Sequence, residues 1–258
     1  MNKKLFIAIA TLSGTVIGAG ILGIPHVVSK SGFGIGLIHL IGLFLITLAI
    51  KLMFTEVVLS SKTIHQIPGY ASKYLGKKTK HFVFLATALG FYAAFVAYLI
   101  GEGNSLSFLF TGSLDYTLWF GLGFFAIMAL LSFRGIKVFK KIEPVVVGLV
   151  LVVIVLLGII NFNNIDLNNL TYNAPSNLFV PFGVVLFSFL GVSAIPEMRR
   201  ILEDNKKLLK KAVIIGMTIP VVVYILFTII VLGLYGASVA QVATISFGKL
   251  VTLLGVFT

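Results

Sequence analysis

Residues 17–25 read IGAGILGIP, and the three glycines within this stretch have the spacing G-x-G-x-x-G. In a dinucleotide-binding loop this spacing follows a strand and precedes a helix, and an acidic residue about 20 positions later holds the ribose. Here the glycines lie inside an apolar run over residues 5–28, and no carboxylate occurs before Glu56. The stretch therefore needs an explanation other than nucleotide binding.

The composition is that of a membrane protein. Hydrophobic residues make up 59% of the chain, charged residues 11%, and the mean hydropathy is +1.10. Backbone groups in lipid must be satisfied within the segment, so a spanning helix needs roughly 20 apolar residues. We expect residues 1–258 to form one transmembrane domain. Seven helices are predicted, over residues 5–28, 33–58, 82–101, 117–133, 143–162, 178–198 and 212–235. An eighth apolar stretch begins near Ile245.

The net charge of +12 follows the membrane topology and does not indicate a nucleic-acid site. Most lysine and arginine residues lie in three loops, over residues 62–80, 134–141 and 199–211, whereas the loops on the other side of the membrane hold Lys30. Cytoplasmic loops carry an excess of these residues, so the N-terminus is predicted to be cytoplasmic. We expect a multi-pass protein of the cell membrane, whose partners are the lipid bilayer and a small molecule and do not include nucleic acid.

Two of the predicted helices are interrupted by small residues and prolines. Each glycine in a helix lowers the stability of the helix by about 1 kcal/mol relative to alanine. The first predicted helix contains three glycines within the few residues before Pro25. The sixth helix repeats this pattern in PFGVVLFSFLGVSAIPE, residues 181–197. Two interrupted helices in corresponding positions are typical of transporters built from inverted repeats, which bind substrate where both helices unwind. Close helix packing through small residues is the alternative interpretation.

The same segments resemble a known family. Residues 13–33, SGTVIGAGILGIPHVVSKSGF, and 183–202, GVVLFSFLGVSAIPEMRRIL, resemble the first and sixth helices of amino acid permeases of the amino acid/polyamine/organocation superfamily. The likeness is to the aromatic amino acid permease and amino acid/auxin permease branches. It implies an all-α, leucine-transporter-like fold of five plus five inverted helices, with the first repeat over 1–162 and an incomplete second repeat over 178–258. Because that core has ten helices, we expect this chain to be a fragment of a longer protein.

The resemblance implies that the substrate binds at the two helix breaks. Free backbone groups there would hold the carboxylate and the ammonium of an amino acid, because half-helix ends carry partial charges of both signs. The third helix would form the wall of the side-chain pocket through Tyr92 and Phe95, with Phe91 and Tyr98 as further candidates. The candidates in the first and sixth helices are Ile17, Gly18, Ala19, Gly20, Ile21, Gly23, Ser188, Phe189, Leu190 and Gly191.

The sequence leaves the coupling ion open between Na+ and H+, and it indicates no organic cofactor and no metal. No carboxylate lies deep inside a predicted helix, and Glu102 is expected at the outer end of the third. His39, roughly 9 Å inside the second helix, could carry a proton but is interpreted as a hydrogen-bonded structural histidine. Lys51 and Lys249 lie nearer the helix ends and are expected to snorkel to the membrane surface.

These observations predict a secondary active amino acid transporter. It would carry neutral or aromatic amino acids by ion-coupled symport and alternating access. A membrane sensor or receptor that binds an amino acid without moving it is the alternative. An enzyme is disfavoured, because no predicted helix pairs a nucleophile with a base or contains a metal-ligand cluster such as H-E-x-x-H.

Overall fold

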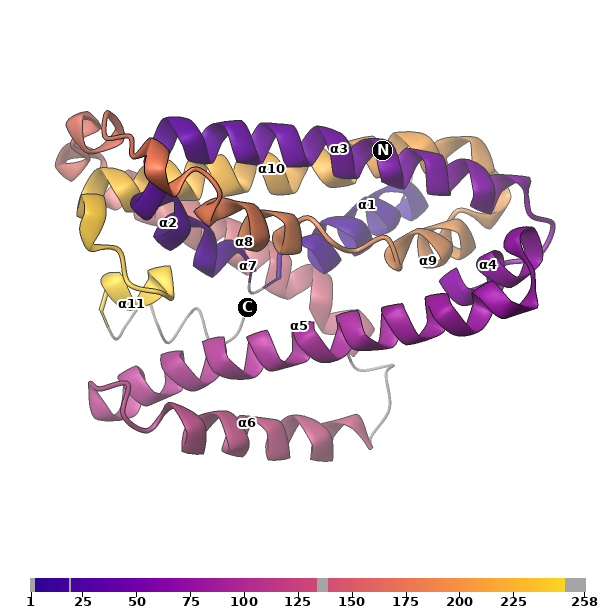
Figure 1. Ribbon diagram of the computed structural model, residues 1–258, viewed down its shortest axis with the longest axis horizontal. Coiled ribbons are helices and arrows are strands. Elements are labelled where there is room, and N and C mark those ends of the chain that lie inside the picture. The colour runs from indigo at the N-terminus through magenta and orange to yellow at the C-terminus, as the bar shows by residue number, and fades with distance from the viewer. Residues whose placement is uncertain (1–2, 19, 134–138, 249–258) are drawn as a thin grey trace.

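The computed structural model describes residues 3–18, 20–133 and 139–248, and the described residues form α-helices joined by short turns (Figure 1). In this described part of the chain, five short 3-10 helices lie in the connections, at Phe162–Asn164, Leu167–Leu170, Pro175–Asn177, Glu203–Leu208 and Gly236–Ser238. The α-helices are α1 (Lys3–Val16), α2 (Gly20–Ser31), α3 (Phe33–Ser60), α4 (Ile67–Leu75), α5 (Lys77–Thr111), α6 (Thr117–Ser132), α7 (Phe139–Ile160), α8 (Val180–Ser188), α9 (Ala194–Ile201), α10 (Leu209–Tyr235) and α11 (Ala243–Ser246).

The helices are those of an all-α membrane protein. Within the described residues, α3, α5 and α10 are each long and apolar enough to cross a membrane. Helices α1 and α2 meet the same criterion as a pair bent by 50°. Each of the seven predicted helices corresponds to one observed helix or to one broken pair. The eighth apolar stretch lies mostly outside the described residues, and its described part includes the last turn of α11.

The interior surrounds the two broken helices. Helix α1 packs against α7, α9 and α10, and α2 packs against α3, α8 and α10 (Figure 1). Leu12 of α1, Ile24 of α2 and Tyr224 of α10 are fully buried there. Lipid tails are as apolar as these side chains, so dispersion and close packing stabilise the contacts more than the hydrophobic effect does.

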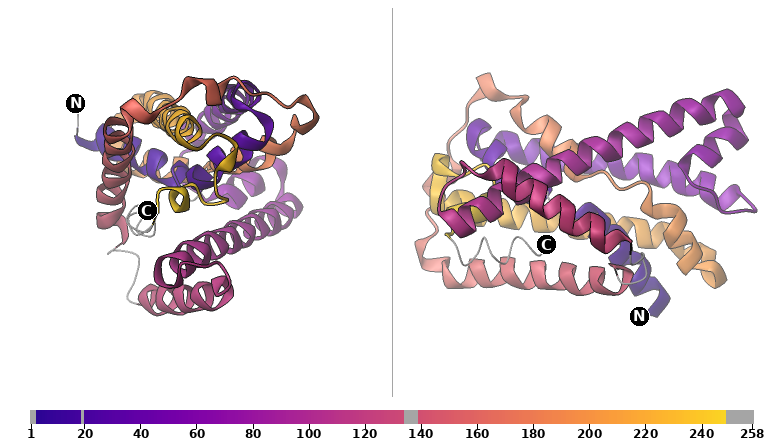
Figure 2. Two further views of the ribbon diagram at one scale, coloured as in Figure 1. Left: turned by 90° about the vertical axis from the view of Figure 1, so that its left-hand side faces the viewer. Right: turned by 90° about the horizontal axis from the view of Figure 1, so that it is seen from below.

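Helices α5 and α6 form a hairpin that lies to one side of the other helices (Figure 2). Their backbones approach closely, because a β-carbon on Gly121 would lie 3.0 Å from the carbonyl oxygen of Leu99. Helix α5 continues to Thr111, well beyond its predicted end. Glu102, which was expected at the outer end of the helix, therefore lies within α5 and is buried.

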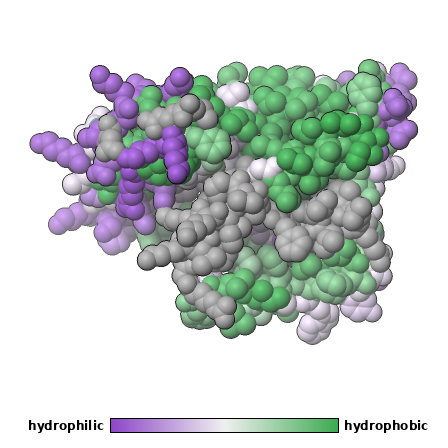
Figure 3. All heavy atoms as spheres, turned by 180° about the vertical axis from the view of Figure 1, so that it is seen from behind, coloured by the Kyte–Doolittle hydropathy of each residue, from purple (hydrophilic) through white to green (hydrophobic). Residues whose placement is uncertain are grey.

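Hydrophilic residues form a smaller group at one end of the molecule and gather mainly at the other end (Figure 3). The last turn of α3, the short helix α4, the first turn of α5 and the start of α10 all lie at this end (Figure 1). Glu56 of α3 and Lys210 of α10 form an ion pair there. The turns over residues 161–177 lie at the opposite end, where Gly32 forms a β-bridge with Asn173. The belt between the two ends is apolar, as expected for a surface in contact with lipid.

Candidate substrate site at two helix breaks

The first break separates α1 from α2. Helix α1 ends at Val16, and the amide of Gly18 donates to the Val16 carbonyl at 2.8 Å instead of continuing the helical pattern. Helix α2 begins at Gly20, and the pair is bent by 50°. The break predicted from the glycines is therefore confirmed, while Ala19, a predicted site residue, lies outside the described residues.

The second break separates α8 from α9. Helix α8 ends at Ser188 and α9 begins at Ala194. Between them Gly191 has φ 120°, a conformation that residues with a β-carbon rarely adopt, so glycine allows the chain to leave the helix. Within the described part of the chain, the amides of Gly191, Val192 and Ser193 donate no hydrogen bond. These N–H groups at the start of α9 are available to an acceptor.

Glycines bring the two breaks into contact. A β-carbon on Gly20 would lie 2.9 Å from Cα of Ser188 and would overlap the serine hydroxyl. One turn further along α2, a β-carbon on Gly23 would lie 3.3 Å from the side chain of Val184. Helices α2 and α8 therefore meet through their backbones. The glycines serve both the helix break and close packing, which were considered as alternatives.

Tyr224 connects the two breaks from α10. Its buried hydroxyl lies 2.6 Å from the carbonyl oxygen of Val16 and 2.9 Å from that of Ser188. In continuous helices these carbonyls would accept from the amides four residues later, at Gly20 and Val192. The tyrosine therefore takes the place of backbone donors that the breaks remove. This role of Tyr224 was not predicted from the sequence, because the same helix carries further hydroxyl groups at Thr218, Thr228 and Tyr235.

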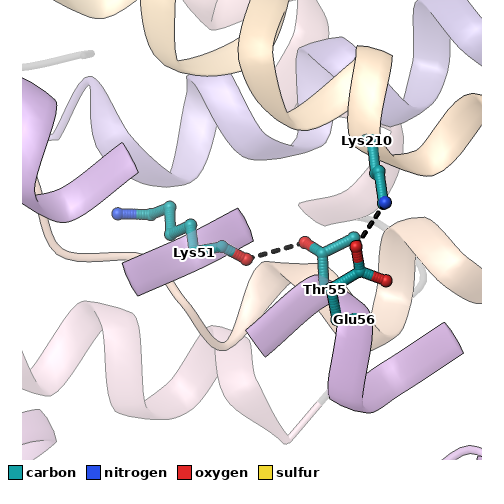
Figure 4. A network of polar contacts seen from close by, with 4 residues as sticks. All are labelled: Lys51, Thr55, Glu56 and Lys210. Atoms are coloured by element: carbon teal, nitrogen blue, oxygen red, sulfur yellow. Dashed lines mark hydrogen bonds and ion pairs between the residues drawn. The ribbon is translucent and has the colours of Figure 1, made fainter. Parts of the chain in front are cut away.

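Lys51 reaches the second break from α3. Its Nζ donates to the carbonyl oxygen of Phe189 at 2.6 Å, and the residue is only 3% exposed. The expectation that this lysine snorkels to the surface is wrong. Its side chain points into the molecule, because the Phe189 carbonyl lacks the Ser193 amide that a continuous helix would supply. Figure 4 shows the side chain extending away from the Glu56–Lys210 ion pair.

The aromatic candidates of α5 divide into two groups. The hydroxyl of Tyr98 lies directly over Gly18, because a β-carbon there would overlap it. The ring of Phe95 instead packs edge-on against Phe125 of α6, with centroids 5.7 Å apart. The structure thus brings Tyr98, which is itself 36% exposed, to the first break. The other aromatic candidates are more exposed than Tyr98: Phe91, Tyr92 and Phe95.

The remaining candidates contribute mainly backbone. Ile17 and Ile21 bury their side chains in the interior, and Phe189 packs its ring against Tyr224 with centroids 5.3 Å apart. Leu190 is half exposed. His39 Nδ1 donates to the carbonyl of Ile35 in its own helix at 2.9 Å, which agrees with a structural histidine.

The electrostatics of the two breaks suit a zwitterion. Helices α2 and α9 begin at the breaks, and helix N-termini carry partial positive charge. Helices α1 and α8 end there, and helix C-termini carry partial negative charge. A molecule with a carboxylate beside an ammonium can find both poles within one site.

Comparisons with known proteins show a family and several similar proteins. The model of the tryptophan/tyrosine permease family matches residues 1–257. The chain is 27% identical over 243 residues to tyrosine-specific transport system 1 of Haemophilus influenzae, covering 91% of this chain and 58% of that protein. Glutamine transporter 2 of Aliivibrio fischeri is 25% identical over 239 residues, covering 90% of this chain and 62% of that protein.

A shorter match concerns tyrosine-specific transport system 2 of Haemophilus influenzae, which is 32% identical over 108 residues. It covers 42% of this chain and 27% of that protein. The chain therefore spans less than two thirds of the length of the curated relatives that it matches.

Proposed function

Because the chain belongs to the tryptophan/tyrosine permease family, a family of transporters and not of enzymes, we propose that it acts in secondary active transport of amino acids across the cell membrane. The contact between Gly20 of α2 and Ser188 of α8 supports this proposal most directly, because it joins the two helix breaks into one site. A continuous helix forms its own backbone hydrogen bonds, and each break interrupts this pattern. Inside a membrane, such non-helical backbone occurs only where it lines a water-filled cavity or is buried in protein.

The proposed substrate position follows from the poles of the broken helices. The carboxylate of the amino acid would accept from the open amides over residues 191–193 and from the start of α2. The ammonium would lie near the ends of α1 and α8. The hydroxyl of Tyr98, over Gly18, would border the side chain of the substrate. No buried charged side chain is needed for either group.

We propose aromatic amino acids as the substrates, with tyrosine first. Two of the similar proteins are named tyrosine-specific transport systems, and the third is named a glutamine transporter. Other large neutral amino acids are therefore the natural competitors. In the proposed cycle α1, α2, α8 and α9 move against the other helices. The first of two inverted repeats would comprise α1 to α7, and the second would begin at α8.

The test is counterflow of labelled L-tyrosine into liposomes that contain the intact protein and unlabelled tyrosine. We expect uptake above that of protein-free liposomes, competition by phenylalanine and tryptophan, and weaker competition by glutamine. Binding of the same label to detergent-solubilised protein is measured in parallel. Binding without counterflow would contradict transport and favour the sensor. The absence of both would contradict the proposed site.

The proposed orientation places the N-terminus in the cytoplasm. A cysteine that replaces Ser72 in α4 should be protected from a membrane-impermeant thiol reagent added outside intact cells, and a cysteine that replaces Asn168 should be labelled. The two positions lie at opposite ends of the molecule (Figure 1), and the chain contains no cysteine that could react in the background. The reverse labelling pattern would overturn the orientation.

A further inference from the structure

The bond between Lys51 and Phe189 joins an ionisable group to the moving part of the proposed site. Lys51 lies in α3 about nine residues, or about 14 Å, before the end of that helix at Ser60. Its Nζ is 2.6 Å from the Phe189 carbonyl oxygen, in the segment between α8 and α9. Ionisable side chains inside membrane helices are costly and are usually functional. The family match and the substrate site do not explain why this position holds a lysine.

The surroundings of Lys51 contain few charges that could neutralise it. Among the described residues no carboxylate forms an ion pair with Lys51, and Glu56 of the same helix pairs with Lys210 on the far side (Figure 4). Helix α8 carries no titratable side chain. The titratable residues of the other helices packed against α3 are His26 and Lys30 in α2, Glu197, Arg199 and Arg200 in α9, and Lys210, Lys211, Tyr224 and Tyr235 in α10.

Of these groups, Tyr224 is the one that reaches the same break. Its hydroxyl is 2.9 Å from the Ser188 carbonyl, next to the carbonyl that Lys51 holds. His26 points elsewhere, with Nδ1 2.8 Å from the Val239 carbonyl. Two side chains therefore fix two successive carbonyls at the end of α8. The tyrosine bond is between neutral groups, whereas the strength of the lysine bond depends on whether Nζ carries its third proton.

We propose that Lys51 binds the proton that is coupled to transport, and that its ammonium form locks the segment after α8 to α3. A hydrogen bond from an ammonium is roughly twice as strong as one from a neutral donor. When the proton passes from Nζ to a water molecule, the electron pair of the broken N–H bond stays on nitrogen and the weaker amine bond releases the segment. Protonation from water on the other side restores the lock. This inference rests on the proposed transport function.

The proposal predicts which gradient drives uptake by the intact protein in liposomes, with L-tyrosine as the probe. An inward proton gradient at equal Na+ should drive accumulation, and an inward Na+ gradient at equal pH should not. Lys51→Met removes the proton site, and Lys51→Arg keeps a charge that is not released. In both variants, accumulation should fall about tenfold or more, which corresponds to about 1.4 kcal/mol, while tyrosine counterflow continues at a reduced rate.

Lys210→Met is the matched control. It also removes one lysine, but from an ion pair whose side chains are 50% and 57% exposed, and such pairs contribute little. This variant should accumulate tyrosine as the wild-type protein does. Wild-type accumulation by either Lys51 variant under a proton gradient, or accumulation driven by Na+, would overturn the proposal. If neither variant inserts into the membrane, a pH dye inside wild-type liposomes should report acidification as tyrosine enters, and an unchanged signal would overturn it.

The outcomes also separate this inference from the proposed function. Wild-type counterflow without any proton entry would remove the role of Lys51 and leave transport in place. The absence of wild-type counterflow would overturn both. Glu102, buried in α5, is a second place where a proton could be held, and accumulation that is lost in Glu102→Gln but kept in Lys51→Met would assign the proton to α5 instead.

Discussion

Replacing Gly20 with valine is expected to weaken tyrosine binding by about tenfold or more while the protein still inserts into the membrane. A β-carbon at this position would lie 2.9 Å from Cα of Ser188, so no side-chain rotation on α8 relieves the clash. The helices must separate, and overpacking of this kind typically costs 1–3 kcal/mol. Separation also moves the start of α2 away from the amides at the start of α9. Affinity should therefore fall by about tenfold at the least.

The measurement is equilibrium binding of labelled tyrosine to solubilised protein, together with the elution profile on size exclusion. Gly183→Val is the matched control. Gly183 lies in α8, one element of the same site, but a β-carbon there would meet no heavy atom within 4 Å. The control should bind tyrosine normally. Unchanged affinity in Gly20→Val would show that the contact between the two breaks is not part of the binding site.

Replacing Tyr224 with phenylalanine is expected to destabilise both breaks at once. The change removes a single oxygen atom, yet it leaves the Ser188 carbonyl without a donor in the described part of the protein and leaves the Val16 carbonyl with the Gly18 amide as its donor. A buried polar group left unsatisfied costs about 1–3 kcal/mol. We expect the melting temperature in detergent to fall by about 5 °C or more, at the usual 2–4 °C per kcal/mol for a chain of this size. Tyrosine counterflow should fall with it.

Tyr235→Phe provides the comparison, because it makes the same chemical change in the same helix. Its ring packs against Phe247, with centroids 5.2 Å apart, and its hydroxyl forms no hydrogen bond with the described residues. Its melting temperature should remain within about 2 °C of the wild type, as for most substitutions away from buried networks. Equal losses in the two variants would show that the Tyr224 hydroxyl does not stabilise the breaks.

The helices and both breaks could be predicted from the sequence, because each depends on local composition. Apolar runs show which segments cross the membrane as helices, and clusters of glycine and proline show where these helices are interrupted. The side chains that complete the breaks could not be predicted in the same way. Lys51 meets Phe189 across 138 positions of sequence, and hydropathy does not distinguish a lysine that faces lipid from one that faces a broken helix.

The sequence could not choose among the aromatic residues of α5 for a related reason. Tyr92, Phe95 and Tyr98 lie within two turns of one helix, and their order says nothing about which face meets the first break. The hairpin with α6 decides this, since it turns Phe95 toward Phe125 and leaves Tyr98 over Gly18. Contacts between helices therefore decide which aromatic residue of α5 lies at the first break, and the sequence of α5 alone does not.

The side chains that hold the two breaks make the proposed site preorganised. Tyr224 and Lys51 hold the carbonyls of Val16, Ser188 and Phe189 without any help from a substrate. An arriving amino acid therefore meets a backbone that is already unwound and fixed, so its binding energy is not consumed in ordering that backbone. In the proposed site, the same fixed shape would penalise molecules whose carboxylate and ammonium are spaced differently, so the rigidity of the breaks would give selectivity for α-amino acids.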